Sequence, residues 1–132
     1  MKKIIYFLFI LLFAFVAGCS EDEKTTDPIV DPVVNPTFTI STISVDPQFA
    51  FAFYCSMDVY LFSYEVINPL QQSYGVTALG DFQLLVGQAY TDAFVYPKLS
   101  GLWRVHFKGK KLSDQKSFDV WAQVNISAKN QF

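Results

Sequence analysis

The fold is decided by two stretches of alternating residues, Trp103-Arg104-Val105-His106-Phe107-Lys108 and Phe118-Asp119-Val120-Trp121-Ala122-Gln123-Val124-Asn125-Ile126. In both stretches apolar side chains occupy every second position, the spacing that places them on one face of a β-strand. The connection between them, residues 109–116, is rich in Gly, Lys, Ser and Asp. Two such stretches joined by a polar loop predict an antiparallel hairpin with one buried face.

The same alternation continues towards the N-terminus as far as Phe38. Residues 49–55 predict a strand with four apolar side chains on one face: Phe49, Phe51, Phe53 and Cys55. Residues 59–67 predict a second strand, which carries Tyr60, Phe62, Tyr64 and Val66 on one face and ends at Asn68-Pro69. Residues 76–79 and 82–86 predict a shorter pair of strands separated by Gly80-Asp81. About seven short strands without a helical period predict an all-β domain, a single antiparallel β-sandwich over residues 38–132.

A short apolar segment opens the chain. A basic start, Met1-Lys2-Lys3, precedes 12 uninterrupted apolar residues, Ile4–Phe15, and small residues then lead to Cys19. About 18 or more apolar residues are needed to span a bilayer, whereas the apolar part of a signal peptide has about 7–15. The segment therefore predicts an export signal and not a transmembrane anchor.

The tetrad Val16-Ala17-Gly18-Cys19 resembles the lipobox of bacterial lipoproteins. The resemblance implies that residues 1–18 form a cleaved signal peptide and that Cys19 is acylated, with palmitate-type chains on its sulfur and new amine. It also implies the membrane as a partner, through the N-terminal lipid. The alternative is an ordinary secretory signal in which the cysteine occurs by chance.

The acidic run Ser20-Glu21-Asp22-Glu23 is similar to the surface-export signal of Bacteroidota lipoproteins. This resemblance implies an outer-membrane protein displayed on the cell surface; the alternative is a solvated acidic leader without a receptor. Residues 27–36 then place a proline at every fourth position, which prevents a helix and favours an extended spacer. We therefore expect residues 19–37 to comprise the lipidated cysteine, the acidic run and a proline-rich spacer.

The segment Pro97-Lys98-Leu99-Ser100-Gly101-Leu102-Trp103-Arg104-Val105-His106-Phe107 resembles the start of strand F in immunoglobulin-like and fibronectin type III domains. In the resemblance, Trp103 takes the place of the tyrosine-corner residue and Val105 that of the second core cysteine. Cys55 lies near the place of the first. With valine at the second place, the family disulfide cannot form. The resemblance implies an immunoglobulin-like sandwich and transfers no functional residue, because this fold has many functions.

Composition and motifs argue against several classes of function. Seven acidic and seven basic residues follow Phe38, and this balance excludes a nucleic-acid partner, which requires a basic face. His106 is the only histidine and the domain has no second free cysteine, so we expect no metal site. Cys55 lies within an apolar alternation, which favours a buried inert thiol; the alternative is pairing with a cysteine of another chain. No catalytic or nucleotide-binding motif occurs. We therefore expect no enzyme, no catalytic residue and no cofactor.

Trp121 suggests a binding face. It alternates with the core residues of its stretch and is therefore expected to point outward, on the sheet that also carries Arg104 and His106. If the 59–67 strand lies beside the 103–108 strand, either Tyr60 and Tyr64 or Val59 and Leu61 also face outward there, and Tyr60 and Tyr64 complete the candidate face. The alternative is that the linker, a loop or the tail 129–132 covers Trp121.

Four lysines around the last hairpin, Lys108, Lys110, Lys111 and Lys116, suggest either a solvated loop or a docking patch for an acidic partner. Taken together, the sequence favours a non-enzymatic, lipid-anchored binding or adhesion module. Its expected ligand is a glycan or an envelope or extracellular protein. The alternative is a periplasm-facing structural subunit of an outer-membrane complex.

Overall fold

The computed structural model describes residues 32–128, and the residues from Val34 onward form one compact unit. The signal peptide, Cys19 and the acidic run lie outside the described residues. Within residues 32–128 there are eight strands and no helix: β1 (Phe38–Val45), β2 (Gln48–Cys55), β3 (Val59–Ile67), β4 (Ser73–Leu84), β5 (Ala89–Thr91), β6 (Tyr96–Pro97), β7 (Gly101–Lys111) and β8 (Ser117–Ile126). It follows that this part of the chain contains no helix long and apolar enough to cross a membrane.

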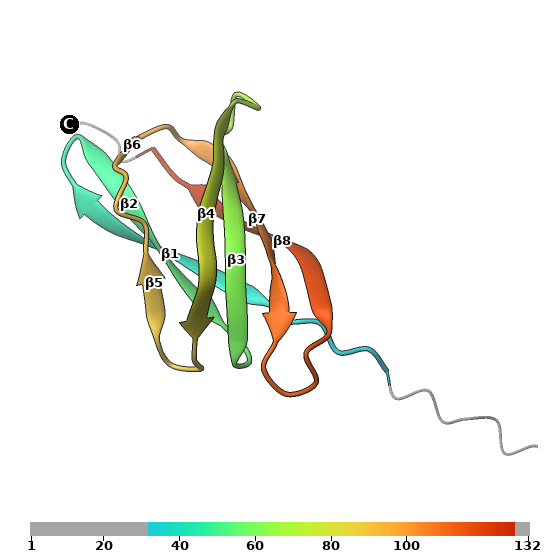
Figure 1. The fold of residues 1–132 in the computed structure, drawn as a ribbon. Coiled ribbons are helices and arrows are strands. Elements are labelled where there is room, and N and C mark those ends of the chain that lie inside the picture. Colours follow the sequence, from blue (N-terminus) through green and yellow to red (C-terminus); the bar gives the residue numbers. More distant parts are fainter. Residues whose placement is uncertain (1–31, 129–132) are drawn as a thin grey trace, which may run out of the picture. The chain divides into compact units, whose positions relative to one another are not determined.

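The strands form two antiparallel sheets that pack face to face (Figure 1). The first sheet has the order β1-β2-β5, with the two-residue β6 also pairing with β2, and the second has the order β4-β3-β7-β8. The predicted all-β sandwich is confirmed, with eight strands in place of about seven. The predicted hairpin is β7–β8, and β3 lies beside β7.

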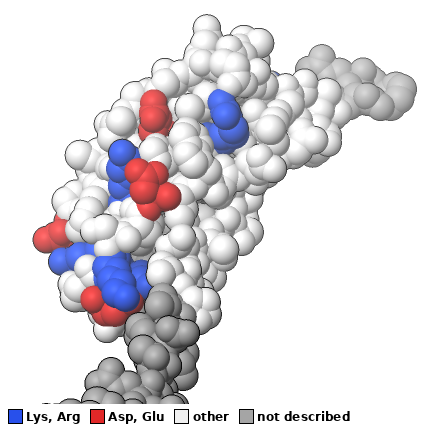
Figure 2. Space-filling view, turned by 90° about the vertical axis from the view of Figure 1, so that its right-hand side faces the viewer, with Lys and Arg blue, Asp and Glu red and all other residues white. Residues whose placement is uncertain are grey.

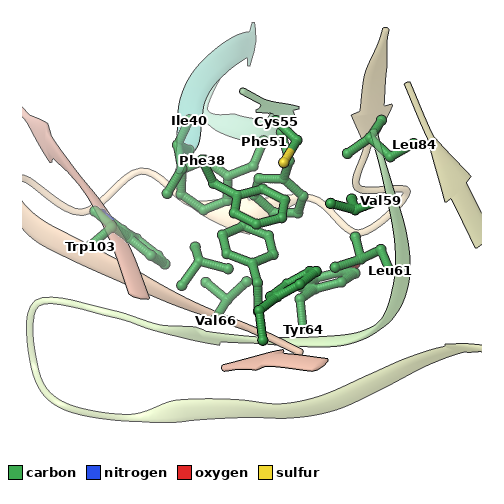
Figure 3. Packing of buried hydrophobic residues seen from close by; sticks show 14 of the residues in the cluster. Phe38, Ile40, Phe51, Cys55, Val59, Leu61, Tyr64, Val66, Leu84 and Trp103 are labelled. Atoms are coloured by element: carbon green, nitrogen blue, oxygen red, sulfur yellow. The ribbon is translucent and has the colours of Figure 1, made fainter. Parts of the chain in front are cut away.

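Aromatic rings fill the space between the sheets (Figure 3). The inward face of β2 supplies Phe49, Phe51, Phe53 and Cys55, and β7 supplies Trp103, Val105 and Phe107, all of them buried as the alternation predicts. The rings of Phe38 and Phe107 are stacked with centroids 4.0 Å apart, which joins the first strand to the second sheet. Burial of large apolar side chains stabilises such a domain by about 1.5–3 kcal/mol each.

The prediction that Tyr60 and Tyr64 lie on the same face of β3 is wrong, because the alternation is interrupted after Leu61. Leu61 pairs with Gly109 and Ser63 with Lys108, so β3 has one residue more than β7 at this point. This bulge reverses the inward and outward positions that follow it. Tyr64 therefore points into the core, with 2% of its surface exposed. Tyr64 does not belong to the outer face, whereas Tyr60, which precedes the bulge, does.

The predicted break at Gly80-Asp81 is also wrong, because β4 runs continuously through it. Between the pairs Leu61–Phe82 and Ser63–Ala78, β4 advances by four residues and β3 by two. Gly80 has a φ of +68°, a conformation that favours glycine, and lies in this irregular part of the pairing. The glycine therefore marks a bulge within one long edge strand.

Candidate binding face

The outer face of the β4-β3-β7-β8 sheet brings the predicted residues together. Strand register places Glu65 opposite His106 on β7, and His106 opposite Trp121 on β8. Because cross-strand partners project to the same side of a sheet, these three side chains form one row across its surface. Arg104 belongs to the next row along β7 on one side of His106, and Lys108 to the next on the other.

Trp121 is 52% exposed and points outward, the orientation that its alternation predicts. Its ring stacks on His106, with centroids 4.2 Å apart and parallel planes. His106, an outward residue of β7, is therefore half-buried beneath the indole. Residues 32–128 therefore leave about half of the Trp121 surface exposed, and the tail 129–132 lies outside the described residues.

Arg104 is held close to Trp121 by the turn between β3 and β4. Its Cζ lies 5.7 Å from the indole centroid, a distance at which the cation and the ring attract each other. Its Nη2 donates a hydrogen bond to the side-chain oxygen of Gln71. Asn68 stabilises this turn: its buried Oδ1 accepts hydrogen bonds from the backbone N–H groups of Leu70 at 2.9 Å and Gln72 at 3.0 Å. Asn68-Pro69, read from the sequence as a strand break, thus also helps to position Gln71 beside Arg104.

Asp119 lies on the edge strand β8, where it contacts both His106 and Lys108 of β7. Its Oδ1 accepts a hydrogen bond from His106 Nε2, and its Oδ2 lies 3.5 Å from Lys108 Nζ. The hydrogen bond from His106, together with the charge of Lys108, lowers the pKa of the Asp119 carboxyl. Glu65 accepts a hydrogen bond from the hydroxyl of Ser73 on β4. Both acids are therefore already engaged with neighbours on the sheet.

A hollow of about 230 Å³ lies on this face and is lined by Ser63, Tyr64, Glu65, Val76, His106 and Lys108. Figure 2 shows that acidic and basic side chains are interspersed on the side of the molecule it displays. The side shown therefore has no large region of a single charge.

A second pair of cation and aromatic side chains lies towards the other end of β7. Lys110 Nζ is 5.0 Å from the ring centroid of Tyr60 and 5.8 Å from that of Phe62. Tyr60 and Lys110 are also register partners, so the two side chains share the outer face. Of the aromatic residues predicted for this face, the structure thus places Trp121 and Tyr60 there.

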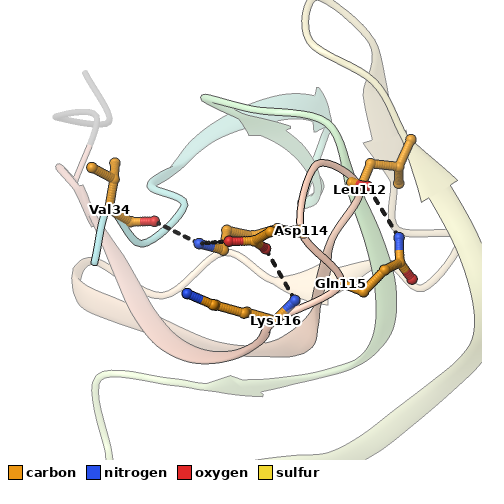
Figure 4. Close-up of polar contacts among 6 residues, drawn as sticks. Val34, Leu112, Asp114, Gln115 and Lys116 are labelled. Atoms are coloured by element: carbon orange, nitrogen blue, oxygen red, sulfur yellow. Dashed lines mark hydrogen bonds and ion pairs between the residues drawn. The ribbon is translucent and has the colours of Figure 1, made fainter. Parts of the chain in front are cut away.

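The four lysines do not form one patch. Lys111 is buried, with its Nζ 2.9 Å from Asp114 Oδ2 and 3.4 Å from the carbonyl oxygen of Val34 (Figure 4). Asp114 also accepts the backbone N–H of Lys116 at 3.0 Å. Lys111 therefore ties the start of the compact unit to the β7–β8 loop and is not available to a partner.

Asp92 is the polar residue whose environment the sequence does not reveal. It is 1% exposed and accepts hydrogen bonds from the Tyr96 hydroxyl and, at 2.8 Å, from the Phe94 N–H. Burial, reinforced by the Asp92 carboxylate, raises the pKa of both Tyr96 and Tyr64. The Asp-x-Phe spacing of a local side-chain turn is the signal that identifies part of this arrangement. Because Asp92 is buried and hydrogen-bonded within the fold, we assign it a structural role.

Within the described residues, no group of three or more His, Cys, Asp or Glu side chains is arranged to hold a metal ion. Comparison with protein-family models, curated proteins and solved structures gave no match to this chain.

Proposed function

We propose that this protein is a non-enzymatic, lipid-anchored protein of the outer membrane that displays its sandwich on the cell surface as a binding module. The observation that carries the proposal is the exposed Trp121, whose ring stacks on His106 and lies close to the Arg104 guanidinium. An exposed aromatic side chain rimmed by polar groups is typical of a binding surface for sugar rings or for another protein. The anchor itself is proposed from Cys19 and the residues around it.

An immunoglobulin-like domain is the finer fold that we propose. The two-sheet strand order, β1-β2-β5 and β4-β3-β7-β8, is compatible with it. The Trp103 indole N–H donates to the carbonyl oxygen of Leu99, four residues earlier, at 2.9 Å. This bond links the start of β7 to the preceding loop, as a tyrosine corner does.

A periplasm-facing accessory subunit is the second candidate, and β4 favours it. This strand is twelve residues long, lies at a sheet edge and exposes Tyr74, Val76 and Phe82. An exposed edge strand presents unpaired backbone groups with which a strand of another protein can pair.

Protease treatment of intact cells distinguishes the two locations. We expect the sandwich to be lost while a periplasmic lipoprotein in the same cells survives. Protection of the sandwich until the outer membrane is opened would refute surface display. The lipid anchor is tested by Cys19→Ser, which should release most of the protein from membranes, because stable anchoring needs two acyl chains or an equivalent second signal.

Binding through the outer face is tested with Trp121→Ala in the full-length protein purified in detergent and applied to glycan and protein arrays. The matched control is Tyr54→Ala, which removes an exposed aromatic side chain from the other sheet. We expect Trp121→Ala to lose the ligands that the wild-type protein and Tyr54→Ala retain. Equal binding by all three proteins would remove this face from the proposal.

A further inference from the structure

We infer that the outer surface of β7 binds a linear acidic polysaccharide, one whose sugar rings carry carboxylates; this inference rests on the proposed binding function. Four side chains project outward from alternate positions of this central strand: Arg104, His106, Lys108 and Lys110. With a rise of about 3.3 Å per residue, the row from Arg104 to Lys110 is about 20 Å long. A straight row of this length on a sheet surface suits an extended polymer better than a small compact ligand.

Charge is unevenly compensated along the row. Lys108 and His106 share Asp119 in the middle. At the two ends, neither Arg104 nor Lys110 has a carboxylate within ion-pairing distance among residues 32–128. The two uncompensated cations are therefore available to anionic groups on a ligand.

Each uncompensated cation lies beside an aromatic ring. Arg104 is next to Trp121, and Lys110 is next to Tyr60 and Phe62. An aromatic face packs against the apolar face of a sugar ring, while the adjacent cation pairs with a carboxylate on that ring or its neighbour. The same combination at both ends of the row matches a polymer that presents rings and carboxylates repeatedly.

Other macromolecules fit this surface less well. A nucleic acid requires a strongly basic face, whereas this row offers only two uncompensated cations, one at each end. The core of a protein–protein interface is depleted in charged residues, whereas charged side chains run through the middle of this row. A neutral glycan would leave Arg104 and Lys110 without an anionic partner. The arrangement therefore favours an acidic polysaccharide.

The probe is polygalacturonate, with its carboxyl-reduced, neutral form as the matched ligand, and binding is measured by affinity electrophoresis of the full-length protein in detergent. We expect at least tenfold tighter binding of the acidic polymer, and weaker binding when salt is raised from 50 to 200 mM. Arg104→Gln and Lys110→Gln should each weaken binding about threefold to tenfold. Lys116→Gln, in the β7–β8 loop, is the control that should bind like wild type. Unchanged thermal unfolding midpoints show that the variants are folded.

The outcomes separate this inference from the proposed function. Equal binding of both polymers that is abolished by Trp121→Ala would overturn the acidic ligand and leave the binding face intact. Failure to bind either polymer, or acidic binding that Arg104→Gln and Lys110→Gln do not weaken, would overturn the inference. Loss of binding to the acidic polymer alone in these two variants would support it.

Discussion

Trp103 and Trp121 are the only tryptophans of the chain, and they offer a matched test of the packing. Trp103 is completely buried, whereas Trp121 is half exposed. The Trp103 ring packs edge-on against Phe49 and Phe51, with centroids 5.3 and 5.5 Å away. Its indole N–H donates to the Leu99 carbonyl oxygen. Trp103→Phe removes this hydrogen bond and one fused ring while keeping an aromatic side chain.

The expected loss of stability follows from these two changes. Removal of the hydrogen bond costs about 1 kcal/mol and leaves the Leu99 carbonyl without its partner. The missing ring and the space it leaves cost about a further 1–2 kcal/mol. The free energy of unfolding should therefore fall by about 2–3 kcal/mol, which for a domain of this size lowers the midpoint temperature by roughly 10–20 °C.

Urea unfolding followed by far-UV circular dichroism measures this loss, with Trp121→Phe as the control. Trp121 contributes mainly one cross-strand contact with His106, so the control should lose less than about 1 kcal/mol. A loss below about 1 kcal/mol for Trp103→Phe, or equal losses for the two variants, would refute the assignment of Trp103 to the centre of the core.

Three further predictions follow from buried groups. Gly109→Ala should lower the free energy of unfolding by at least about 3 kcal/mol, because the new Cβ would lie 2.1 Å from the carbonyl oxygen of Tyr60. Urea unfolding measures this loss, and a loss under about 1 kcal/mol would contradict the close packing at Gly109. The raised pKa of Tyr64 and Tyr96 stabilises the fold fully below pH 10, the ordinary tyrosine value, and this stabilisation is lost as the pH rises above it. In an alkaline absorbance titration both hydroxyls should ionise only on unfolding, and ionisation of every tyrosine in the folded protein near pH 10 would disprove their burial. Burial also raises the pKa of the Cys55 thiol, so iodoacetamide should alkylate Cys55 at pH 7.5 only after the protein is denatured. Mass spectrometry of the Cys55 peptide measures this, and rapid labelling of the native protein would contradict the burial of Cys55.

The sequence predicts the strands of the core well because each has a clear alternation. Residues 59–67 were expected to form a strand, and β3 has these bounds. The same alternation misplaced Tyr64, because a bulge depends on how β3 pairs with both neighbours and not on its own residues. Gly80 was misread for a related reason: a glycine with positive φ suits a bulge as well as a turn.

The candidate face was only partly predictable. Alternation identifies Trp121, Arg104 and His106 as outward residues of one hairpin, but the stacking of Trp121 on His106 depends on the register between β7 and β8. The burial of Asp92 depends on Tyr96, which approaches it from the following strand. Such pairings are set by tertiary geometry, which no single stretch of sequence contains.

The attachment of the first strand has a mechanical consequence. Val34 accepts a hydrogen bond from Lys111, and Thr37 exchanges two hydrogen bonds with Ser56, at the end of the sandwich where β1 begins. From there β1 pairs with β2 over eight consecutive residues. A pull on Val34 directed along β1 and away from the sandwich therefore loads this ladder in shear, so that its bonds resist together and do not open one after another. A domain attached at this point is built to hold its fold under tension from its N-terminal side.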